Sequence, residues 1–321
     1  MSAHARYAAR AAKALGYAFR SLDGADGYLF EVRDGARKAL FAAGAGTPYA
    51  LNDARAGSIA RDKAFCAAVL AEAGLPTIPG RLFFVTEQYA EMRRPGRELA
   101  DVRAFAVGAD YPLFCKPIAA SNGLFAEIIT SAAAFEDYLT RVGRAHFAIL
   151  VQPYVRGTEH RVFVLEGRAL FSYRKHLPRV TGDGVSTLRA LIAALPREHA
   201  APLAQARARD TAGASVALDE VLAAGAHVEV EGPANRATGG GATAPTEDVP
   251  AALAALGLKA AAAIGLGLAG VDVFDRSPAG DFSDLVVIEV NSNPMIRTLE
   301  EHERWDLIVA IWRANIEAAL R

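Results

Sequence analysis

Carboxylate and amide side chains stand inside two apolar stretches of this sequence. Asp272 lies within residues 268–274, and Glu289 lies within residues 285–290 with Asn291 two positions further on. Side chains two residues apart in a strand share a face, so Glu289 and Asn291 project together, and pairing the two stretches would bring Asp272 to them. Mg²⁺ prefers such oxygen-only ligands, often together with phosphates. We predict a metal site, the alternative being that Asp272 caps a turn and Glu289 forms a salt bridge.

Strands and helices must position these side chains. The polar segment between the two stretches predicts an antiparallel hairpin with a long loop, and a helix over residues 250–264 leads into it. Further upstream, an apolar strand over residues 111–118 includes Lys116 and is followed by a loop of small residues. A helix capped by Ser58 and running to about Ala73 would place Lys63 midway along it.

The remaining sequence predicts a mixture of helices and strands. Residues 1–57 predict a short helix and a hairpin turning at Asp34-Gly35. A helix is predicted to begin within Glu87–Met92, and another to follow Ser186 as its cap. Residues 196–250 are rich in alanine, glycine and proline, and we expect a partly helical insertion there.

Composition excludes several classes of protein. Hydrophobic residues make up 52% of the 321 residues and charged residues 22%, which is typical of a globular chain. The 35 Lys and Arg balance the 36 Asp and Glu, so we expect neither a nucleic-acid nor a membrane partner. The two cysteines, Cys66 and Cys115, predict no disulfide framework and fit a cytoplasmic location. No stretch resembles a signal peptide or a membrane span.

The order of several motifs resembles that of ATP-grasp ligases. Two stretches, Gly157–Gly167 and Val180–Gly184, and the loop Asn235–Gly240 narrow the resemblance to the ATP-grasp half of bifunctional glutathione synthetases and of cyanophycin synthetase. The resemblance covers about residues 58–300. The ordered motifs are Asp62-Lys63, Cys115–Pro117, Val151–Glu159, Asp272 and Glu289–Pro294.

The resemblance implies a fold and a division of the chain. The expected fold is α+β, the ATP-grasp fold, with two α/β lobes that grip ATP, a mobile lid subdomain and antiparallel sheets. The implied divisions are an N-terminal segment of unknown role (1–57), an N-terminal ATP-grasp subdomain (58–110), a lid subdomain (111–155), and a C-terminal subdomain (156–321) with an insertion at about 196–250.

The resemblance also implies which residues contact ATP. Lysines would neutralise phosphate charge, the lid loop would approach the phosphates, a connector would contact adenine, and an acid would hold the ribose. A solvated lysine, a strand-end ion pair or a turn acid is the alternative for the individual charged residues. The implied ATP contacts are Lys63, Lys116, Ser121, Asn122, Gly123, Gln152, Pro153, Tyr154, Val155 and Glu159.

Four further residues are implied to act on the reacting groups. Arg161, Arg174 and Lys175 would face a developing acyl phosphate, and Asn235 belongs to the glycine-containing loop that approaches it. Ordinary cross-strand charge pairing and a merely flexible loop are the alternatives. Asp272, Glu289 and Asn291 would hold two Mg²⁺ ions, with Mn²⁺ as the alternative metal.

The expected function is an ATP-dependent ligase that joins a small-molecule carboxylate to an amine, in an amino acid or short peptide, through an acyl phosphate. The alternatives are a kinase of the same fold and a weak or inactive ATP-binding module; homo-oligomerisation is left open.

Two departures from the family bear on the expected activity and substrate. The loop Ala119–Leu124 has a single glycine, and Glu231 stands near the position where relatives carry an arginine. An acid there predicts a substrate with less negative charge, and hence not a glutathione synthetase.

Overall fold

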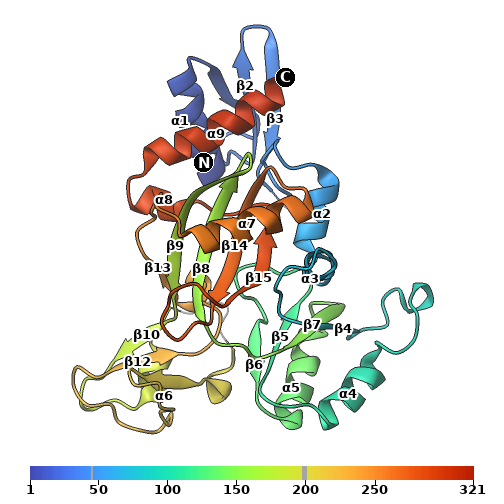
Figure 1. Cartoon of the computed structure of the whole chain (residues 1–321), viewed down its shortest axis with the longest axis vertical. Helices are drawn as coiled ribbons and strands as arrows, with labels where there is room; N and C mark the ends of the chain where they lie inside the picture. Colours follow the sequence, from blue (N-terminus) through green and yellow to red (C-terminus); the bar gives the residue numbers. More distant parts are fainter. Residues whose placement is uncertain (45, 197–200) are drawn as a thin grey trace. The chain divides into compact units, whose positions relative to one another are not determined.

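The computed structural model describes residues 1–44, 46–196 and 201–321 (Figure 1). The chain divides into two compact units, each assembled from segments that are far apart in the sequence. Unit 1 comprises Met1–Thr77, His160–Tyr173 and Ala244–Arg321, and unit 2 comprises Ile78–Glu159 and Arg174–Thr243. The subdomain boundaries inferred from the family resemblance stay a prediction. Within the described ranges, no helix is both long and apolar enough to cross a bilayer.

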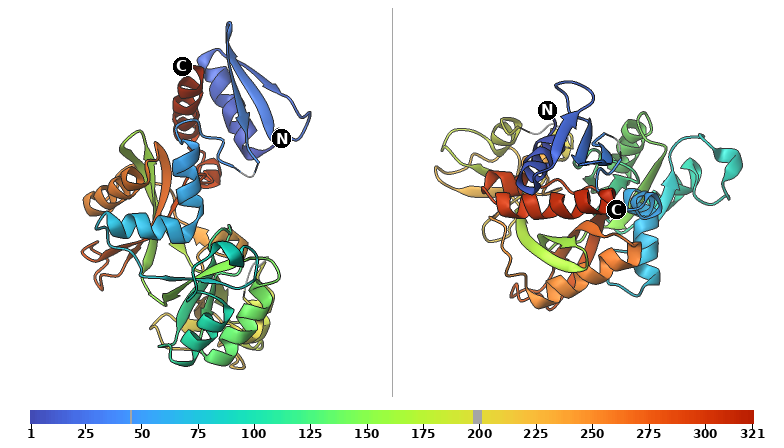
Figure 2. Two further views of the ribbon diagram at one scale, coloured as in Figure 1. Left: turned by 90° about the vertical axis from the view of Figure 1, so that its right-hand side faces the viewer. Right: turned by 90° about the horizontal axis from the view of Figure 1, so that it is seen from above.

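A three-stranded antiparallel sheet and two helices form one part of unit 1 (Figure 2). Ser2 caps the first helix, and Gly16 ends it in the left-handed region at φ 74°. The predicted turn at Asp34-Gly35 joins β2 and β3, and a third strand, β1, pairs with β2. Trp312 of the closing helix is fully buried beside the rings of Phe30 and Phe41. The elements are α1 (Ala3–Leu15), β1 (Ala18–Ser21), β2 (Leu29–Asp34), β3 (Arg37–Ala42) and α9 (Trp305–Leu320).

A buried histidine in this part should make the stability of the protein depend on pH. His4 packs against Tyr49 and Trp312, its Nδ1 has no hydrogen-bond partner in the described residues, and burial lowers its pKa to about 4. Below its ordinary value of 6.5 the unfolded chain binds the proton first, so stability is lost as pH falls from 6.5 towards 4. Between pH 7 and pH 4.5 the loss should be about 2–3 kcal/mol. Urea unfolding at both pH values should show this extra loss in the wild type and not in His4→Leu; an equal loss in both would contradict it.

A five-stranded sheet carries the predicted hairpin. Its strand order is β13-β9-β8-β14-β15, and β14 and β15 are the antiparallel pair predicted from the sequence. In unit 1, α7 lies across this sheet (Figure 1), and its buried side chains pack with Val162, Val271 and Val290. Gly257 of α7 lies close to Val162, where an added Cβ would come within 3.0 Å. The elements are β8 (Thr158–Leu165), β9 (Arg168–His176), β13 (Gly241–Ala242), α7 (Ala251–Ile264), β14 (Leu268–Asp275), β15 (Leu285–Asn291) and α8 (Arg297–Glu301).

The helix predicted from Ser58 to Ala73 is two helices, so that prediction was wrong in its cap and in its continuity. Asp53 caps α2 (Ala54–Arg61), and Asp62 caps α3 (Lys63–Glu72) by accepting from the backbone N–H groups of two residues after it. Asp62 has extended backbone angles (φ −86°, ψ 109°), which interrupt the helical hydrogen bonds. Lys63 therefore begins a helix instead of standing in the middle of one.

Unit 2 contains an antiparallel sheet of strand order β4-β7-β5-β6, with two helices against it. The predicted strand around Lys116 is present, and Ser131 caps the helix that begins at Ala132. Residues Glu87–Met92 form only a short 3₁₀ turn, and the predicted helix begins at Leu99 instead, where Glu98 and Asp101 make a capping box. The elements are β4 (Arg81–Phe84), η1 (Ala90–Met92), α4 (Leu99–Val107), β5 (Leu113–Pro117), β6 (Glu127–Ile129), α5 (Ala132–Val142) and β7 (Ala148–Pro153).

The segment predicted as a partly helical insertion is mostly strand and loop in its described part; residues 197–200 lie outside the described residues. A further sheet, of order β10-β12-β11, packs on a short helix that Thr187 caps, where Ser186 had been predicted. Alternating valines of β12 are buried in this cluster, which favours a strand there. The elements are β10 (Arg179–Thr181), α6 (Leu188–Ala193), η2 (Leu203–Gln205), β11 (Ala208–Asp210), β12 (His227–Val230) and η3 (Arg236–Thr238).

Candidate active site

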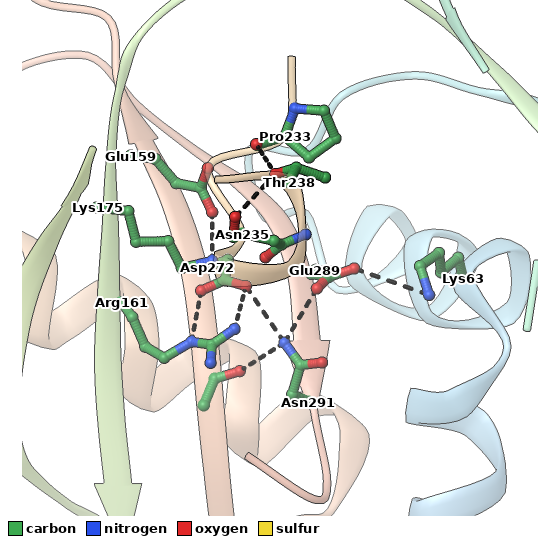
Figure 3. A network of polar contacts seen from close by, with 11 residues as sticks. Lys63, Glu159, Arg161, Lys175, Pro233, Asn235, Thr238, Asp272, Glu289 and Asn291 are labelled. Atoms are coloured by element: carbon green, nitrogen blue, oxygen red, sulfur yellow. Dashed lines mark hydrogen bonds and ion pairs between the residues drawn. The ribbon is translucent and has the colours of Figure 1, made fainter. Parts of the chain in front are cut away.

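Asp272 and Glu289 are direct cross-strand partners on β14 and β15. The register shifts immediately after Asp272, so a bulge follows the carboxylate. Asn291 lies two residues beyond Glu289, and its Nδ2 donates to Glu289 Oε1 at 3.2 Å and to Asp272 Oδ2 at 3.3 Å (Figure 3). The three side chains predicted as metal ligands therefore lie together on one face of the hairpin.

Arg161 of β8 forms a two-point ion pair with Asp272. Its Nε lies 2.7 Å from Oδ1 and its Nη2 lies 2.6 Å from Oδ2 (Figure 3). Asp272 is 1% exposed, so the pair is shielded from water. Burial lowers the pKa of Arg161, but the charge and hydrogen bonds of Asp272 outweigh burial and hold that pKa above its ordinary value. The arginine thus fixes the position of a carboxylate that would be costly to bury alone.

Lys63 approaches the same pair of carboxylates from α3. Its Nζ lies 3.9 Å from Glu289 Oε2, and the Glu289 side chain is 27% exposed (Figure 3). Two carboxylates are hard oxygen donors, which fit Mg²⁺ or Mn²⁺, whereas the Asn291 amide presents its Nδ2 to them and would have to turn to offer its oxygen to a metal. No cluster of three His, Cys, Asp or Glu side chains occurs in the described ranges, so the amide of Asn291 is needed to complete a set of three.

The other charged residues predicted on the β8–β9 hairpin separate into two faces. In unit 2, Lys175 Nζ lies 2.5 Å from Glu159 Oε1, and both side chains are largely buried. Arg174 is exposed, as the alternation of side chains along β9 requires. The structure therefore joins Lys175 to Glu159, the residue predicted to hold the ribose, and turns Arg174 away from that pair.

The predicted phosphate lysine and adenine connector also lie in unit 2. Lys116 is 4% exposed on β5, with its Nζ 5.9 Å from the centre of the Phe114 ring. Gln152 is buried, and its Nε2 donates to the carbonyl of Ile78 at 2.8 Å. The connector after it, Pro153, Tyr154 and Val155, is partly or fully exposed. Its backbone and that of Gln152 are the groups of this stretch most suited to an adenine edge.

Two loops of unit 2 meet at Gly123. Ser121 and Asn122 are exposed, whereas a Cβ at Gly123 would come within 3.0 Å of Asn235 Nδ2. The carbonyl of Asn235 accepts a hydrogen bond from Thr238 Oγ1 (Figure 3). It also accepts from the backbone N–H groups of Thr238 and Gly240. A Cβ at Gly240 would overlap the carbonyl of His176 at 2.8 Å. The predicted lid loop and the predicted phosphate loop are therefore neighbours, packed through positions where only glycine fits.

Glu231, the acid found near the position where relatives carry an arginine, is surrounded by arginines. Its side chain is 5% exposed and lies 2.8 Å from Arg207 Nε, 2.7 Å from Arg209 Nε and 2.9 Å from Arg156 Nη2. Burial raises the pKa of Glu231, and the hydrogen bonds and charges of the arginines more than offset it, so the pKa lies below its ordinary value. The premise of a repulsive negative charge here was wrong, because the local charge is positive.

Sequence reasoning missed residues of the N-terminal segment that hold the hairpin ends. Asn52 Nδ2 donates to the carbonyls of Leu268 and Ser292, and its Oδ1 accepts from Leu268 N–H. The hydroxyls of Thr47 and Tyr49 donate to the carbonyls of Ser292 and Pro294. These bonds fix the start of β14 and the loop after β15. No motif in residues 1–57 predicts these hydrogen bonds, because a backbone carbonyl accepts from any suitably placed donor and requires no particular residue type.

Residues 207–314 match the family described as RimK-like ATP-grasp domain. The bifunctional glutathione biosynthesis protein GshAB of Streptococcus mutans is 29% identical over 201 residues, which are 57% of this chain and 27% of that protein. Cyanophycin synthetase of Geminocystis herdmanii is 29% identical over 255 residues, which are 74% of this chain and 28% of that protein. The chain thus spans less than a third of the length of these relatives.

Among solved structures, a bifunctional glutathione synthetase from Pasteurella multocida aligns with a TM-score of 0.46 and 22% identity, over 88% of this chain and 39% of that one. A D-alanine–D-alanine ligase from Bacillus anthracis aligns with a TM-score of 0.49 and 14% identity, over 81% and 68%. The range matched to the family includes the loop around Asn235 and the hairpin of Asp272 and Glu289. This chain contains a RimK-like ATP-grasp domain homologous to parts of GshAB and cyanophycin synthetase, which confirms the resemblance seen in its sequence.

Proposed function

We propose that this chain is an ATP-dependent carboxylate–amine ligase that forms an amide or peptide bond, with an amino acid or a short peptide as substrate. The observation that carries the proposal is the carboxylate pair of Asp272 and Glu289, fixed across two strands and contacted by Arg161 and Lys63. Phosphoryl transfer requires neutralisation of charge and alignment more than covalent help, and this arrangement offers both. The ATP-grasp domain supports ATP as the phosphate donor.

The proposed reaction has two steps. A substrate carboxylate oxygen attacks the γ-phosphorus of ATP, the bond from that phosphorus to the β–γ bridging oxygen breaks, and ADP leaves. The nitrogen of the amine then attacks the acyl carbon and loses a proton, and inorganic phosphate leaves with the oxygen that had carried it. The carbon–nitrogen bond formed is the amide.

The carboxylate pair defines where metal would be held. Asp272, Glu289 and Asn291 would hold two Mg²⁺ ions, or Mn²⁺ in their place, and the metal would supply neutralisation of phosphate charge. Arg161 would keep the Asp272 carboxylate in place, and its guanidinium would add positive charge near the developing acyl phosphate. We assign Arg161, Lys175, Arg174 and Asn235 to the reacting groups.

We assign the contacts with ATP to the residues that the family resemblance implied. The lysines at 63 and 116 would reach phosphates, the exposed loop residues Ser121 and Asn122 with Gly123 would cover them, and Glu159 would hold the ribose. The backbone of Gln152–Val155 would meet adenine.

We also propose the subdomains 58–110, 111–155 and 156–321. We propose a cytoplasmic location as well, which suits the thiols of two buried cysteines.

Trapping with hydroxylamine tests the proposed function. Purified protein is given Mg²⁺, ATP, hydroxylamine and a panel of amino acids and dipeptides, and ADP and hydroxamate are both measured. We expect ADP release that depends on a carboxylate and matches hydroxamate formation, because hydroxylamine intercepts an acyl phosphate. ADP release with a stable phosphate ester would mean a kinase. Measurable ATP binding with no ADP from any acid would mean a non-catalytic module.

A further inference from the structure

The candidate metal ligand Asn291 stands at the very end of its strand. β15 ends at this residue, and among the described residues its pair with Gly270 is the last of the β14–β15 ladder at this end. The ends of strands are the parts of a sheet that open most easily. A metal ligand in this place therefore needs support from outside the ladder if it is to keep one geometry.

Asn52 supplies such support within unit 1. Its Oδ1 accepts from the N–H of Leu268 at 3.0 Å, and its Nδ2 donates to the carbonyl of the same residue at 2.8 Å, as a neighbouring strand would. The Nδ2 also donates to the carbonyl of Ser292, the residue after Asn291, at 2.9 Å. Asn52 is only 8% exposed, so its bonds are largely shielded from water. One side chain thus joins β14 to the end of β15 beyond the last pair of the ladder.

Two further side chains of the same segment hold the loop after β15. Thr47 Oγ1 donates to the carbonyl of Ser292 at 2.9 Å, and the Tyr49 hydroxyl donates to the carbonyl of Pro294 at 3.2 Å. Pro294 in turn lies against Gly270, where an added Cβ would come within 2.7 Å of the proline Cβ. The loop is therefore held against β14 at the residue that pairs with Asn291.

The supporting segment is itself fixed on both sides. The N–H of Leu51 donates to Asn315 Oδ1 of α9 at 3.2 Å, and Asn315 is fully buried. On the other side, a Cβ at Gly267 would come within 2.7 Å of the Leu51 carbonyl oxygen. Residues 47–52 lie outside the range 207–314 that matches the family. A segment outside that range thus holds a candidate ligand inside it.

We propose that Asn52 is a positioning residue for metal binding, which holds the backbone at Asn291 in place. From there the Asn291 amide can turn its oxygen to an ion held by Asp272 and Glu289. Asn52 acts through the backbone of Ser292 and not by contact with the ion. The inference rests on the proposed function, because that proposal assigns the metal to these residues. Groups that support a metal ligand typically change metal affinity by about 10–100-fold.

Binding of Mn²⁺ to the nucleotide-free protein, followed by electron paramagnetic resonance, tests this role. Asn52→Ala should raise the Kd for Mn²⁺ about 10-fold, the low end of the usual effect. Tyr7→Phe is the matched control, because it removes a side-chain hydrogen bond of unit 1 that joins α1 to Glu300 of α8. The control should leave the Kd unchanged. An unchanged Kd in Asn52→Ala, or an equal rise in Tyr7→Phe, would overturn the proposal.

A double-mutant cycle separates positioning from a general weakening of the fold. Asn291→Ala removes the proposed ligand itself. Adding Asn52→Ala to it should change the Kd by less than about twofold, because no ligand is then left to position. If the two effects multiply in the double variant instead, Asn52 acts independently of Asn291 and the proposal is wrong.

Thr47→Val provides a milder variant, because it keeps the size of the side chain and removes one hydrogen bond to Ser292. It should also raise the Kd, and urea unfolding shows which variants are folded. If Asn52→Ala does not fold, Thr47→Val with Asn291→Ala gives the same cycle. A wild type that binds no Mn²⁺ would overturn this inference, while hydroxylamine trapping still decides the ligase proposal. A coupled cycle in a protein that traps no hydroxamate would leave the positioning role and remove the ligase.

Discussion

Replacing Glu289 by glutamine is expected to lower turnover by about 10²–10³-fold with little change in stability. The substitution removes one of the two carboxylates proposed to hold metal, whose charge stabilisation is worth several kcal/mol in the transition state, and each 1.36 kcal/mol is tenfold in rate. The Glu289 side chain is 27% exposed and its lysine partner is 3.9 Å away, so little structural energy is lost with its charge. The kcat/KM for ADP release and a urea unfolding curve measure the two effects.

Glu317→Gln is the matched control, because Glu317 is an exposed acid on α9 of the same unit. Binding of Mn²⁺ followed by electron paramagnetic resonance gives a readout that does not need turnover, and the Glu289 variant should bind Mn²⁺ more weakly than the control. Near-wild-type turnover with unchanged Mn²⁺ binding would show that Glu289 holds no metal.

Replacing Asp272 by asparagine is expected to lower the free energy of unfolding by about 3–5 kcal/mol, the cost of leaving a buried charge without its partner. Arg161 would lose a two-point ion pair in a site where Asp272 is 1% exposed. Whole domains are stable by only about 5–15 kcal/mol, so this is a large fraction. Urea unfolding at pH 7 measures it. Loss of activity in an Asp272 variant therefore needs a stability measurement beside it before it is attributed to metal.

Asp284→Asn provides the comparison, because Asp284 pairs with Arg276 on the same hairpin but both side chains are more than 40% exposed. Its cost should stay below about 1 kcal/mol. The double variant Asp272→Leu with Arg161→Met should regain much of the stability, since two apolar residues leave no buried charge behind. A loss for Asp272→Asn no larger than that for Asp284→Asn would mean that the ion pair is not a buried one in solution.

The parts of the fold that were predicted correctly have strong local signals. Two stretches of β-branched residues around a turn predict the hairpin of Asp272 and Glu289. The Asp34-Gly35 dipeptide likewise predicts the hairpin that it joins. The helix break at Asp62 was missed because the apolar pattern runs on through it, while the side chain caps a new helix. The spacing of apolar residues reveals that a segment is helical, but it does not reveal a break of one residue within the segment.

The parts that could not be predicted depend on contacts between distant segments. Nothing in the sequence next to Glu231 indicates that it pairs with three arginines. The arginines reach its carboxylate because β11 pairs with β12 and because the segment after β7 lies beside them. Asn52 lies 216 residues from Leu268, whose backbone it binds on both sides. Motifs in the sequence were therefore enough to propose the candidate residues. They were not enough to predict the distant residues that pair with each candidate or hold it in position.

The interleaving of the two units has a consequence for the order in which they can form during synthesis. The last segment of unit 2 ends at Thr243, whereas the core around Trp312 in unit 1 needs α9, which a ribosome makes some 60 residues later. Unit 2 can thus form all of its internal contacts before α9 has been synthesised. At that stage α1 and the sheet β1-β2-β3 still lack the helix that packs against them. Contacts of such long sequence separation form slowly, and waiting segments expose apolar surface. We expect the early helix and strands, rather than the later-made unit 2, to be the part of the nascent chain that depends on chaperones.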